Sequence, residues 1–312
     1  MNILVTGHKG FVGRAMVERL KGEGHFVVGL DNKKYCSRDL KDLADVFIKG
    51  DVVDYELMRR TVVDYEIEEI YHFASRAING NCANDPLETF RTNLMGMVNV
   101  LEVCRNYGKF VKNIVISTSD KAFGASHIPY TEENELKPLF IYDTSKACQQ
   151  LIALSYFRNY GLPVKVVACS NIYGPKDPNF SRVIPMTVTR LAQGKPARLW
   201  KDSEDHVREF VYIDDVIDAF LKVGKDGVIG EIYCCGGTEH LTIKELMIKI
   251  CSLMEKDSMS EIKIFERPSV SLMEIEEQYI DSSKLKSIGW FPHISLHDGL
   301  KKTIDYYINL AE

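Results

Sequence analysis

The sequence lacks the features that mark membrane proteins and secreted proteins. None of its 312 residues lie in an apolar run long enough to span a bilayer. The first residues, MNILVTGHKG, have no charged start, no long apolar stretch and no small-residue cleavage site, so they do not resemble a signal peptide. We therefore expect a cytoplasmic protein without a membrane partner.

Metal-binding cysteine patterns and an excess of one charge are also missing. The eight cysteines include no CxxC pair and no His/Cys cluster with zinc spacing, so we expect reduced core thiols and no metal. The 39 lysines and arginines are matched by 44 aspartates and glutamates, which gives a net charge of -5. This balance provides no global attraction to nucleic acid, although a local basic pocket for a phosphorylated small molecule is compatible with it.

Short β-branched runs alternate with helical stretches through the first half of the chain. The predicted strands are Ile3–Thr6, Phe26–Leu30, Val46–Lys49, Ile70–Phe73, Asn113–Ser117 and Val164–Cys169. The predicted helices are Phe11–Lys21, Leu57–Tyr65, Leu87–Arg105 and Tyr142–Tyr160. This alternation is typical of βαβ units with right-handed crossovers, and it predicts an α/β protein with a doubly wound parallel sheet.

The regular alternation weakens after residue 172. Turn-forming residues mark irregular chain at Gly174, Pro175, Pro178 and Pro185. The later predicted elements are a strand at Glu231–Cys235 and amphipathic helices at Thr242–Met254 and Leu296–Leu310. We predict a sheet domain formed by residues 1–172 plus 210–235. A smaller C-terminal substrate-binding lobe, residues 173–209 plus 236–312, is fused onto it.

A glycine-rich turn joins the first predicted strand to the first helix. Gly7, Gly10 and Gly13 permit a tight turn, close backbone approach to a pyrophosphate and close packing of the helix on the strand. The helix that begins near Phe11 and Val12 points unpaired N–H groups and a positive dipole end at that pyrophosphate. The position of the triplet, between a strand and a helix, predicts a dinucleotide site.

An acidic residue at the end of the second strand bears on the choice of dinucleotide. Asp31, 18 residues after Gly13, lies where a ribose diol binds, with Asn32 beside it. A carboxylate repels a 2′-phosphate there, so NAD is favoured over NADP, although Lys33 and Lys34 soften that repulsion.

A second acidic residue follows the third strand. Asp51, with Val52 in the GDVVD segment, can accept a hydrogen bond from the adenine amine. A solvated loop carboxylate is the alternative interpretation.

Tyr142 and Lys146 form a YxxxK pair on a predicted helix. Residues i and i+4 share one face of a helix, so the ammonium can stabilise a phenolate. The ordinary tyrosine pKa of about 10 must fall before the side chain acts as a base at neutral pH. A chance pair on a helix surface is the alternative. However, the preceding strand leads into Ser117–Ser119 at the carboxyl edge of the sheet, where open α/β folds bind ligands.

Four segments taken together resemble one family. The glycine triplet, ISTSDKAFG, IYDTSK and CSNIYGP are similar to the extended short-chain dehydrogenase/reductases, which include the NAD-dependent nucleotide-sugar epimerases and dehydratases. The resemblance continues to YIDSSKLKSIGW, so it covers essentially the whole chain. It implies a Rossmann-type fold, NAD as cofactor and a nucleotide-diphosphate sugar as substrate. It also implies a homodimer in which Leu87–Arg105 and Tyr142–Tyr160 pair with their copies.

The resemblance assigns roles to individual residues around the cofactor. It implies that Ser119 binds the hydroxyl group being oxidised, that Tyr142 is the base and that Lys146 binds the nicotinamide ribose. Further cofactor contacts are implied for Phe73, Ala74, Ser75, Asn93 and Ser117.

The two residues after Ser119 distinguish subfamilies. Asp120–Lys121 resembles the pair of CDP-glucose and inverting UDP-N-acetylglucosamine dehydratases, whereas many epimerases have small neutral residues here. Oxidation at C4 acidifies the C5 proton, which a base removes while an acid helps the C6 hydroxyl leave as water. The resemblance makes Asp120 the acid and Lys121 the base, and the lysine then needs a lowered pKa. Solvent-facing strand-end residues are the alternative.

The resemblance also places residues on the substrate side. It implies that Asn171 contacts the sugar or a phosphate, that Arg182 and Val183 wrap the nucleotide, and that Arg208 and Arg267 bind phosphate, for which a guanidinium fork is suited. Several residues depart from the dTDP-glucose dehydratase pattern and indicate another substrate: Arg76, Phe123, Glu274, Glu276 and Glu277.

The leading interpretation is therefore an NAD-dependent nucleotide-sugar 4,6-dehydratase. A C4 epimerase needs the same tyrosine but no acid/base pair, and a C4 dehydrogenase releases its product before the hydride returns. A non-catalytic dinucleotide sensor is a further alternative. Such a sensor needs none of Ser119, Tyr142 and Lys146, so their presence argues against it.

Overall fold

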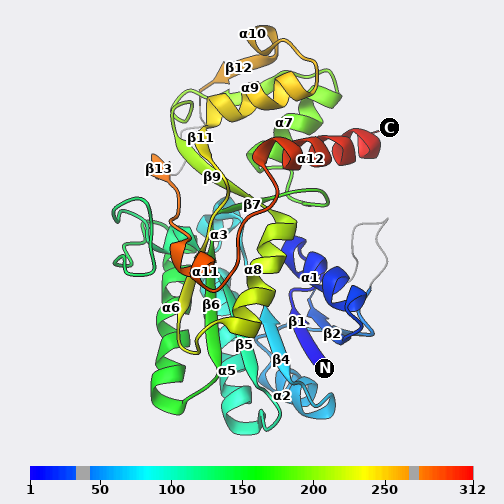
Figure 1. The fold of residues 1–312 in the computed structure, drawn as a ribbon, viewed down its shortest axis with the longest axis vertical. Helices are drawn as coiled ribbons and strands as arrows, with labels where there is room; N and C mark the ends of the chain where they lie inside the picture. The colour runs from blue at the N-terminus through cyan, green and yellow to red at the C-terminus, as the bar shows by residue number, and fades with distance from the viewer. Residues whose placement is uncertain (33–42, 267–273, 312) are drawn as a thin grey trace.

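The computed structural model describes residues 1–32, 43–266 and 274–311 (Figure 1). Its larger part is a parallel sheet of seven strands in the order β10-β6-β5-β4-β1-β2-β3. The strands are β1 (Asn2–Thr6), β2 (Phe26–Asp31), β3 (Val46–Lys49), β4 (Glu69–His72), β5 (Asn113–Ser119), β6 (Val164–Cys169) and β10 (Ile232–Cys235). The predicted α/β class with a Rossmann-type parallel sheet is confirmed.

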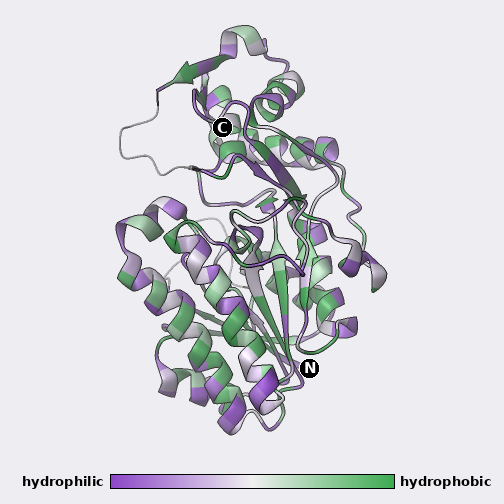
Figure 2. Ribbon diagram, turned by 90° about the vertical axis from the view of Figure 1, so that its left-hand side faces the viewer, coloured by the Kyte–Doolittle hydropathy of each residue, from purple (hydrophilic) through white to green (hydrophobic). Residues whose placement is uncertain are grey.

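Helices cover both faces of this sheet, and alternate strand residues point to each face. One core cluster joins the sheet to α1 (Phe11–Gly22) and α8 (Ile213–Asp226). The other joins it to α2 (Tyr55–Asp64), α5 (Gly96–Tyr107) and α6 (Ile141–Tyr160). Figure 2 shows hydrophobic strands enclosed by helices whose outer surfaces carry hydrophilic residues. Residues buried on both faces explain why the strands read as nearly continuous apolar runs.

The helix predicted over Leu87–Arg105 is present in the structure and contains a π-helical turn. It consists of α4 (Pro86–Phe90), a π-helical turn η1 (Arg91–Met95) and α5. The π turn carries the buried polar side chain of Asn93, which donates to the hydroxyl of Ser145. The predicted helix is confirmed, whereas its apolar periodicity does not reveal this local insertion.

A smaller lobe lies above the carboxyl edge of the large sheet (Figure 1). Its four-stranded sheet contains β7 (Asn171–Tyr173), β9 (Val207–Tyr212), β11 (His240–Thr242) and β13 (Glu277–Gln278). A two-stranded sheet pairs β8 (Ala197–Trp200) with β12 (Ile262–Phe265). The helices after residue 172, apart from α8, are α7 (Val183–Ala192), α9 (Ile243–Leu253), α10 (Ser258–Glu261), α11 (Ser283–Ser287) and α12 (Leu296–Ala311). The short α3 (Asn79–Asn84) lies earlier in the chain.

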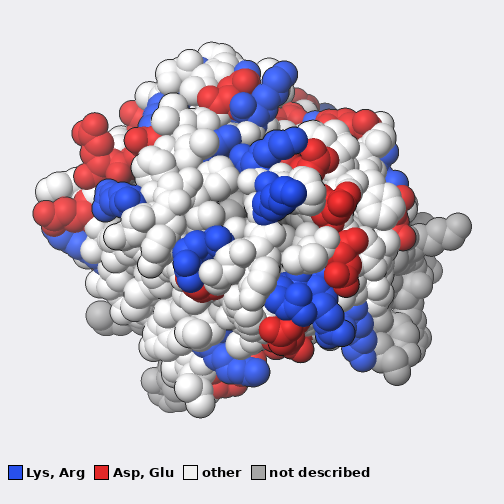
Figure 3. Space-filling view, turned by 90° about the horizontal axis from the view of Figure 1, so that it is seen from below, with Lys and Arg blue, Asp and Glu red and all other residues white. Residues whose placement is uncertain are grey.

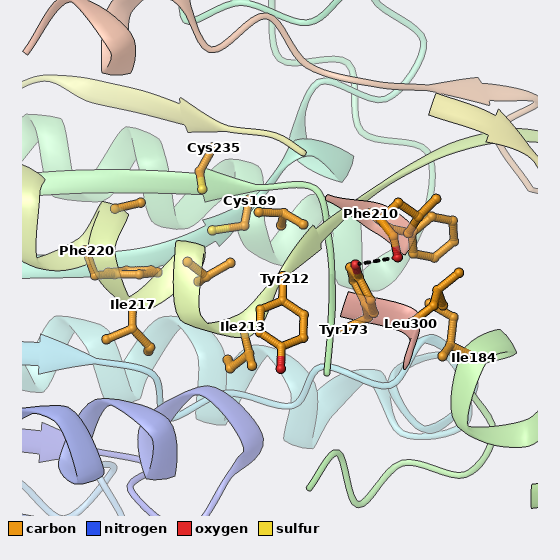
Figure 4. Packing of buried hydrophobic residues seen from close by; sticks show 14 of the residues in the cluster. Cys169, Tyr173, Ile184, Phe210, Tyr212, Ile213, Ile217, Phe220, Cys235 and Leu300 are labelled. Carbon is orange, nitrogen blue, oxygen red and sulfur yellow. Dashed lines mark hydrogen bonds between the residues drawn. The ribbon is translucent and has the colours of Figure 1, made fainter. Parts of the chain in front are cut away.

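The two parts of the molecule share one hydrophobic core. Tyr173 and Phe210 of the small sheet pack in the same cluster as Ile217 and Phe220 of α8 (Figure 4). The rings of Tyr173 and Phe210 are 6.3 Å apart in an edge-to-face arrangement, which aromatic pairs favour. This continuity holds the upper wall of the site against the sheet.

The outer surface carries mixed charge. On the face seen from below, basic and acidic side chains are interspersed (Figure 3). None of the helices in the described part of the chain combines the length and the apolar composition that a bilayer crossing requires.

Candidate active site

A cavity of about 790 Å³ lies between the carboxyl edge of the large sheet and the small lobe. It is lined by residues from α1, β2, β5 and α6 on one side, and from β7, α7, β8 and β9 on the other. The predicted site residues in its wall are Gly7, Gly10, Phe11, Val12, Gly13, Asp31, Asn32, Asp51, Val52, Phe73, Ala74, Ser75, Ser117, Ser119, Asp120, Lys121, Tyr142, Lys146, Asn171, Arg182, Val183 and Arg208. Residues far apart in the sequence therefore meet at the edge where parallel sheets bind ligands.

The glycine turn forms the floor of one end of the cavity. Gly7 has a φ of +70°, and a Cβ built there would lie 2.7 Å from the backbone nitrogen of Ala74. The backbone N–H of Gly10 donates to the carbonyl oxygen of Gly7 at 2.9 Å, and Gly10 caps α1 without a side chain. The first N–H groups of α1 are thus reachable from the cavity, as an anionic diphosphate requires.

Asp31 closes the same end of the cavity. It is the last residue of β2, it is buried, and its carboxylate accepts the backbone N–H of Lys9 at 2.9 Å. The carboxylate of Asp51 accepts the N–H of Val53 at 3.0 Å, which holds it at the start of the loop before α2. The predicted influence of Lys33 and Lys34 lies outside the described residues.

Asn93 lies behind the cavity rather than in its wall. Its Oδ1 accepts the backbone N–H of Arg76 at 2.7 Å, and its Nδ2 donates to the carbonyl oxygen of Arg76 at 3.1 Å and to the Ser145 hydroxyl at 2.9 Å. These bonds occupy the amide, so the predicted direct cofactor contact of Asn93 does not match its placement. The side chain instead fixes the loop after Ser75 against α6.

Lys146 and Tyr142 share the inner face of α6. The ammonium of Lys146 donates to the carbonyl oxygen of Ser117 at 3.0 Å and lies 5.8 Å from the centre of the Tyr142 ring. Burial lowers the pKa of Lys146 to about 8.

The tyrosine departs from the expectation that its pKa falls. Burial raises the pKa of Tyr142, although the guanidinium of Arg182 and the hydroxyl of Ser119 act in the opposite direction.

Ser119, Asp120 and Lys121 lie where β5 turns into a short 3₁₀ helix. The hydroxyl of Ser119 donates to Oδ1 of Asp120 at 2.9 Å and accepts the N–H of Lys121 at 3.3 Å. The ammonium of Lys121 donates to Oε1 of Gln278 at 3.2 Å. Asp120 is only 2% exposed, and burial raises its pKa while Lys121 opposes that rise. The alternative of solvent-facing strand-end residues does not fit this burial.

The predicted substrate residues line the opposite wall. The amide of Asn171 donates to the carbonyl oxygen of Glu209 at 3.0 Å. Arg182 pairs with the buried carboxylate of Asp177 at 2.9 Å. The predicted phosphate ligand Arg267 lies outside the described residues.

Arg208 is the most buried basic group in this wall. Its Nη1 donates to the carbonyl oxygens of Val207 and Glu276 at 2.8 and 3.0 Å, and its Nη2 lies 3.5 Å from the carboxylate of Glu274. Two fixed carbonyl acceptors orient the guanidinium toward the cavity, which suits an anionic ligand.

Sequence reasoning missed two buried carboxyl groups and one amide close to Asp120. Asp143 is fully buried directly after Tyr142, Glu209 is buried directly after Arg208, and Gln278 is buried on β13. Glu209 lies in the segment VREFVY, in which charged residues interrupt a predicted apolar strand. Charged residues are rarely buried without a specific role, so this pattern was the signal by which Glu209 could have been found.

Residues 3–236 match the model of the NAD dependent epimerase/dehydratase family. The chain belongs to this family. The family assignment confirms the predicted resemblance, the prediction of an enzyme and the choice of NAD as cofactor.

Individual relatives include both reaction types. The trifunctional UDP-glucose 4,6-dehydratase/UDP-4-keto-6-deoxy-D-glucose 3,5-epimerase/UDP-4-keto-L-rhamnose-reductase of Arabidopsis thaliana is 32% identical over 100% of this chain and 48% of its own length. The chain thus spans about half of that relative. The crystal structure of UDP-glucose 4-epimerase with UDP-glucose from Thermotoga maritima has a TM-score of 0.92 and 27% identity, with 100% of both chains covered. dTDP-glucose 4,6-dehydratase from Bacillus anthracis, in complex with NAD, has a TM-score of 0.88 and 28% identity, covering 99% of this chain and 97% of that one.

Proposed function

We propose that this chain is an NAD-dependent nucleotide-sugar 4,6-dehydratase. The observation that carries the proposal is the buried Asp120 and the adjacent Lys121, which line one cavity with Ser119 and Tyr142. Oxidation alone needs a base for the C4 hydroxyl, whereas loss of water needs a second acid and base. This site provides a base for the C4 hydroxyl and, separately, an acid and a base for the loss of water.

The residues of the glycine turn and of α6 fit a dinucleotide. Gly7 lies too close to the backbone of Ala74 to carry a side chain, and Gly10 caps α1 without a side chain that would compete with a ligand for the helix N–H groups. In this proposal the turn holds the diphosphate, Asp31 binds the adenosine ribose and Lys146 binds the nicotinamide ribose. Bound NAD supplies the acceptor for the C4 hydride and later its donor to C6.

The chain's own groups move the protons. The hydroxyl of Tyr142 is hydrogen-bonded to that of Ser119. Tyr142 takes the proton of the C4 hydroxyl as the hydride leaves C4. Lys121 then takes the C5 proton, and the electrons of the C5–H bond form the C5=C6 double bond. The C6–O bond breaks, and the proton of Asp120 goes to the departing oxygen, which leaves as water. The 4-keto-5,6-ene that results would then gain the hydride at C6 and a proton from protonated Lys121 at C5, which gives a 4-keto-6-deoxy sugar nucleotide and restores the oxidised cofactor.

The substrate in this proposal is a nucleotide-diphosphate sugar. Arg182 and Arg208 line the wall opposite the glycine turn, and Asn171 and Val183 lie beside them. Two guanidinium groups on one wall suit the two phosphates. We assign residues 1–172 plus 210–235 to the cofactor and residues 173–209 plus 236–312 to the substrate.

A C4 epimerase is the second candidate, because the Thermotoga maritima epimerase superposes over the whole chain. The two reactions are separated by incubating the protein and NAD with UDP-glucose, dTDP-glucose, CDP-glucose and UDP-N-acetylglucosamine. We expect a product lighter by one water with a new C6 methyl signal in its proton NMR spectrum. An unchanged mass with an inverted C4 centre identifies an epimerase, and loss of two hydrogens identifies a dehydrogenase.

We also propose that the protein is a cytoplasmic homodimer. Leu87 of α4 is 80% exposed, Met95 of η1 is 50% exposed and Leu151 of α6 is 59% exposed, so apolar side chains are available on the helices expected to pair. Leu151→Glu should give a monomer in light scattering at micromolar concentration. Met259→Glu, an exposed apolar position on α10, is the matched control and should leave the mass unchanged.

A further inference from the structure

The side chain of Lys121, the proposed base at C5, is held by a residue of the small lobe. Its ammonium donates to Oε1 of Gln278 at 3.2 Å. Lys121 follows β5 at the carboxyl edge of the large sheet, whereas Gln278 belongs to β13 of the four-stranded sheet. This hydrogen bond therefore connects the two parts of the molecule between residues that are 157 positions apart in the chain.

The amide of Gln278 is buried and is occupied on one side only. The side chain is fully buried, and its Nε2 has no hydrogen-bond partner among the described residues. Only Oε1 can accept from an ammonium, so the contact with Lys121 fixes the orientation of the amide. An apolar side chain would fill the same space without leaving a buried donor unpaired. What the glutamine contributes at this position is thus an acceptor for Lys121.

The strand that carries Gln278 is fixed on two sides. It pairs with β9, where Gln278 is in register with Arg208. On its other side the N–H of Tyr130 donates to the carbonyl oxygen of Tyr279 at 2.9 Å, and the N–H of Asp281 donates to that of Tyr130 at 2.8 Å. A lysine side chain has several rotatable bonds, so a fixed acceptor at its end selects one direction for the nitrogen.

The same strand orients a residue of the proposed diphosphate wall. Nη1 of Arg208 donates to the carbonyl oxygen of Glu276 at 3.0 Å. Residues in register project from the same face of a sheet, so Arg208 and Gln278 leave the small sheet together. β13 therefore sets the direction of the arginine and, through Gln278, that of the lysine.

The direction of the bond suits a lysine that acts as a base. Lys121 lines the cavity, whereas Gln278 is buried behind its wall. A neutral amine that donates one N–H to Oε1 must point its lone pair away from this oxygen. The lone pair is then available on the side of the cavity, where the proposed substrate carries the C5 proton.

The neutrality of the amide is a second requirement. A carboxylate at this position would form an ion pair with the ammonium and retain its proton, whereas an amide oxygen adds no charge. In the part of the chain that the structure describes, none of the ion pairs includes Lys121. The charged or titratable groups on the elements around this contact are Asp120, Tyr130, Tyr142, Asp143, Arg208 and Glu209. Burial raises the pKa values of Asp120 and Asp143, which weakens the two nearest carboxyl groups as competitors for the ammonium.

We propose that Gln278 is a positioning residue for the base: its amide oxygen holds the nitrogen of Lys121 in one direction and, because it is neutral, lets that nitrogen lose its proton. The role in removing the C5 proton rests on the proposed dehydratase activity. The effect of Gln278 on the protonation of Lys121 does not, and it can be measured without substrate.

The first test is competitive labelling of the NAD-bound protein with a trace of acetic anhydride, measured by mass spectrometry on the peptide that contains Lys121. Only the neutral amine reacts, so labelling against pH gives the midpoint of its protonation. Gln278→Glu keeps the shape of the side chain and adds a charge, so we expect a midpoint at least about one pH unit higher. Glu277→Gln, which alters the charge at the exposed neighbouring position, is the control and should leave the midpoint unchanged. The same midpoint in the unmodified protein and in Gln278→Glu would overturn the proposal.

The second test follows a single turnover of a sugar nucleotide that the enzyme dehydrates. Gln278→Met removes the acceptor at similar length. Formation of NADH should stay within about twofold of the unmodified rate, whereas exchange of the C5 proton with deuterated solvent should be about tenfold slower. Thr303→Val is the control, because it removes a buried hydrogen bond to the carbonyl oxygen of Gly299 on α12, and both rates should be unchanged.

The pH profile separates positioning from a purely structural role. In Gln278→Glu, the profile of C5 exchange should move to higher pH by the same amount as the labelling midpoint. Equal losses of NADH formation and C5 exchange in Gln278→Met, with no movement of the profile in Gln278→Glu, indicate a structural role only and overturn the proposal. If no sugar nucleotide is dehydrated at all, the proposed function fails, and the labelling still decides the effect of Gln278 on Lys121.

Discussion

The two walls of the cavity are built by different means. At the glycine turn, where we propose that the cofactor binds, the cavity surface is largely backbone: Gly7 and Gly10 carry no side chains, and α1 begins beside them. On the opposite wall, which we propose binds the substrate, the surface is formed by long side chains, of which Arg182 and Arg208 are oriented by ion pairs and carbonyl groups. Backbone surfaces tolerate no added atoms, whereas side-chain surfaces can be altered one group at a time.

Under the proposed function, this difference would let one architecture accommodate several sugar nucleotides. The parallel sheet fixes the glycine turn through neighbouring strands, so its geometry depends on the whole domain. The opposite wall depends on individual residues of β7, α7 and β9, and substitutions there change the ligand without changing the fold. Substitutions in the two walls should therefore differ in the size of their effects.

The largest effect on cofactor affinity is expected when a side chain is added to the backbone wall. Gly7→Val should weaken NAD binding by more than about 100-fold, because the new Cβ collides with the backbone of Ala74. Gly24→Val is the control, since Gly24 has a similar φ of +79° with no atom near its Cβ position. Isothermal titration of NAD separates the two variants. Comparable affinity losses in both would mean that backbone strain, not the shape of the wall, governs binding.

The next effect concerns the acid and the base. Lys121→Ala and Asp120→Asn should each slow elimination by about 10²–10⁴-fold while the first hydride transfer continues, so that NADH accumulates. Stopped-flow absorbance of the nicotinamide measures this. Lys121→Ala should also fail to exchange the C5 proton with deuterated solvent, whereas Tyr142→Phe should form no NADH at all. If Lys121→Ala and Asp120→Asn both turn over as fast as the unmodified enzyme, a C4 epimerase is the better assignment.

A smaller effect is expected on stability. The pKa of Glu209 is raised to about 7 in the folded protein from an ordinary value near 4.5, so the folded state binds this proton more tightly than the unfolded state. The free energy of unfolding should therefore fall as the pH rises from about 4.5 to about 7 and stay lower above it. The contribution is on the order of 3 kcal/mol as an upper bound.

Glu209→Gln removes this dependence. Relative to the unmodified protein, the variant should gain stability between pH 5 and pH 8 in urea unfolding. A constant difference at both pH values would contradict the raised pKa.

The smallest effect is expected at the rim of the backbone wall. Asp31→Ala should relax the preference for NAD over NADP by about tenfold, because one repelling carboxylate is removed from the ribose site. Dissociation constants of both dinucleotides measure the change. Equal constants in the unmodified protein would exclude a selecting role for Asp31.

The sequence predicted those strands and helices whose residue pattern is set by neighbouring residues in the chain. The turn at Gly7 and the pair Tyr142 and Lys146 are short motifs on regular elements, and the strands that carry them have buried, apolar residues. The buried Glu209 was not predicted, because its surroundings arise when β13 pairs with β9, 70 residues along the chain from Arg208 to Gln278. The π turn at Asn93 was missed for the same reason: its partners, Arg76 and Ser145, lie far away in sequence.

The alternation of side chains along β9 limits how this strand can change in evolution. Arg208 and Phe210 line the cavity and Glu209 is buried behind it, so a single inserted or deleted residue would exchange the two faces. The arginine would then enter the buried space, and the glutamate would line the cavity that we propose binds an anionic ligand. Length variation in the family should therefore fall in the flanking loops and spare this strand, whatever the sugar nucleotide.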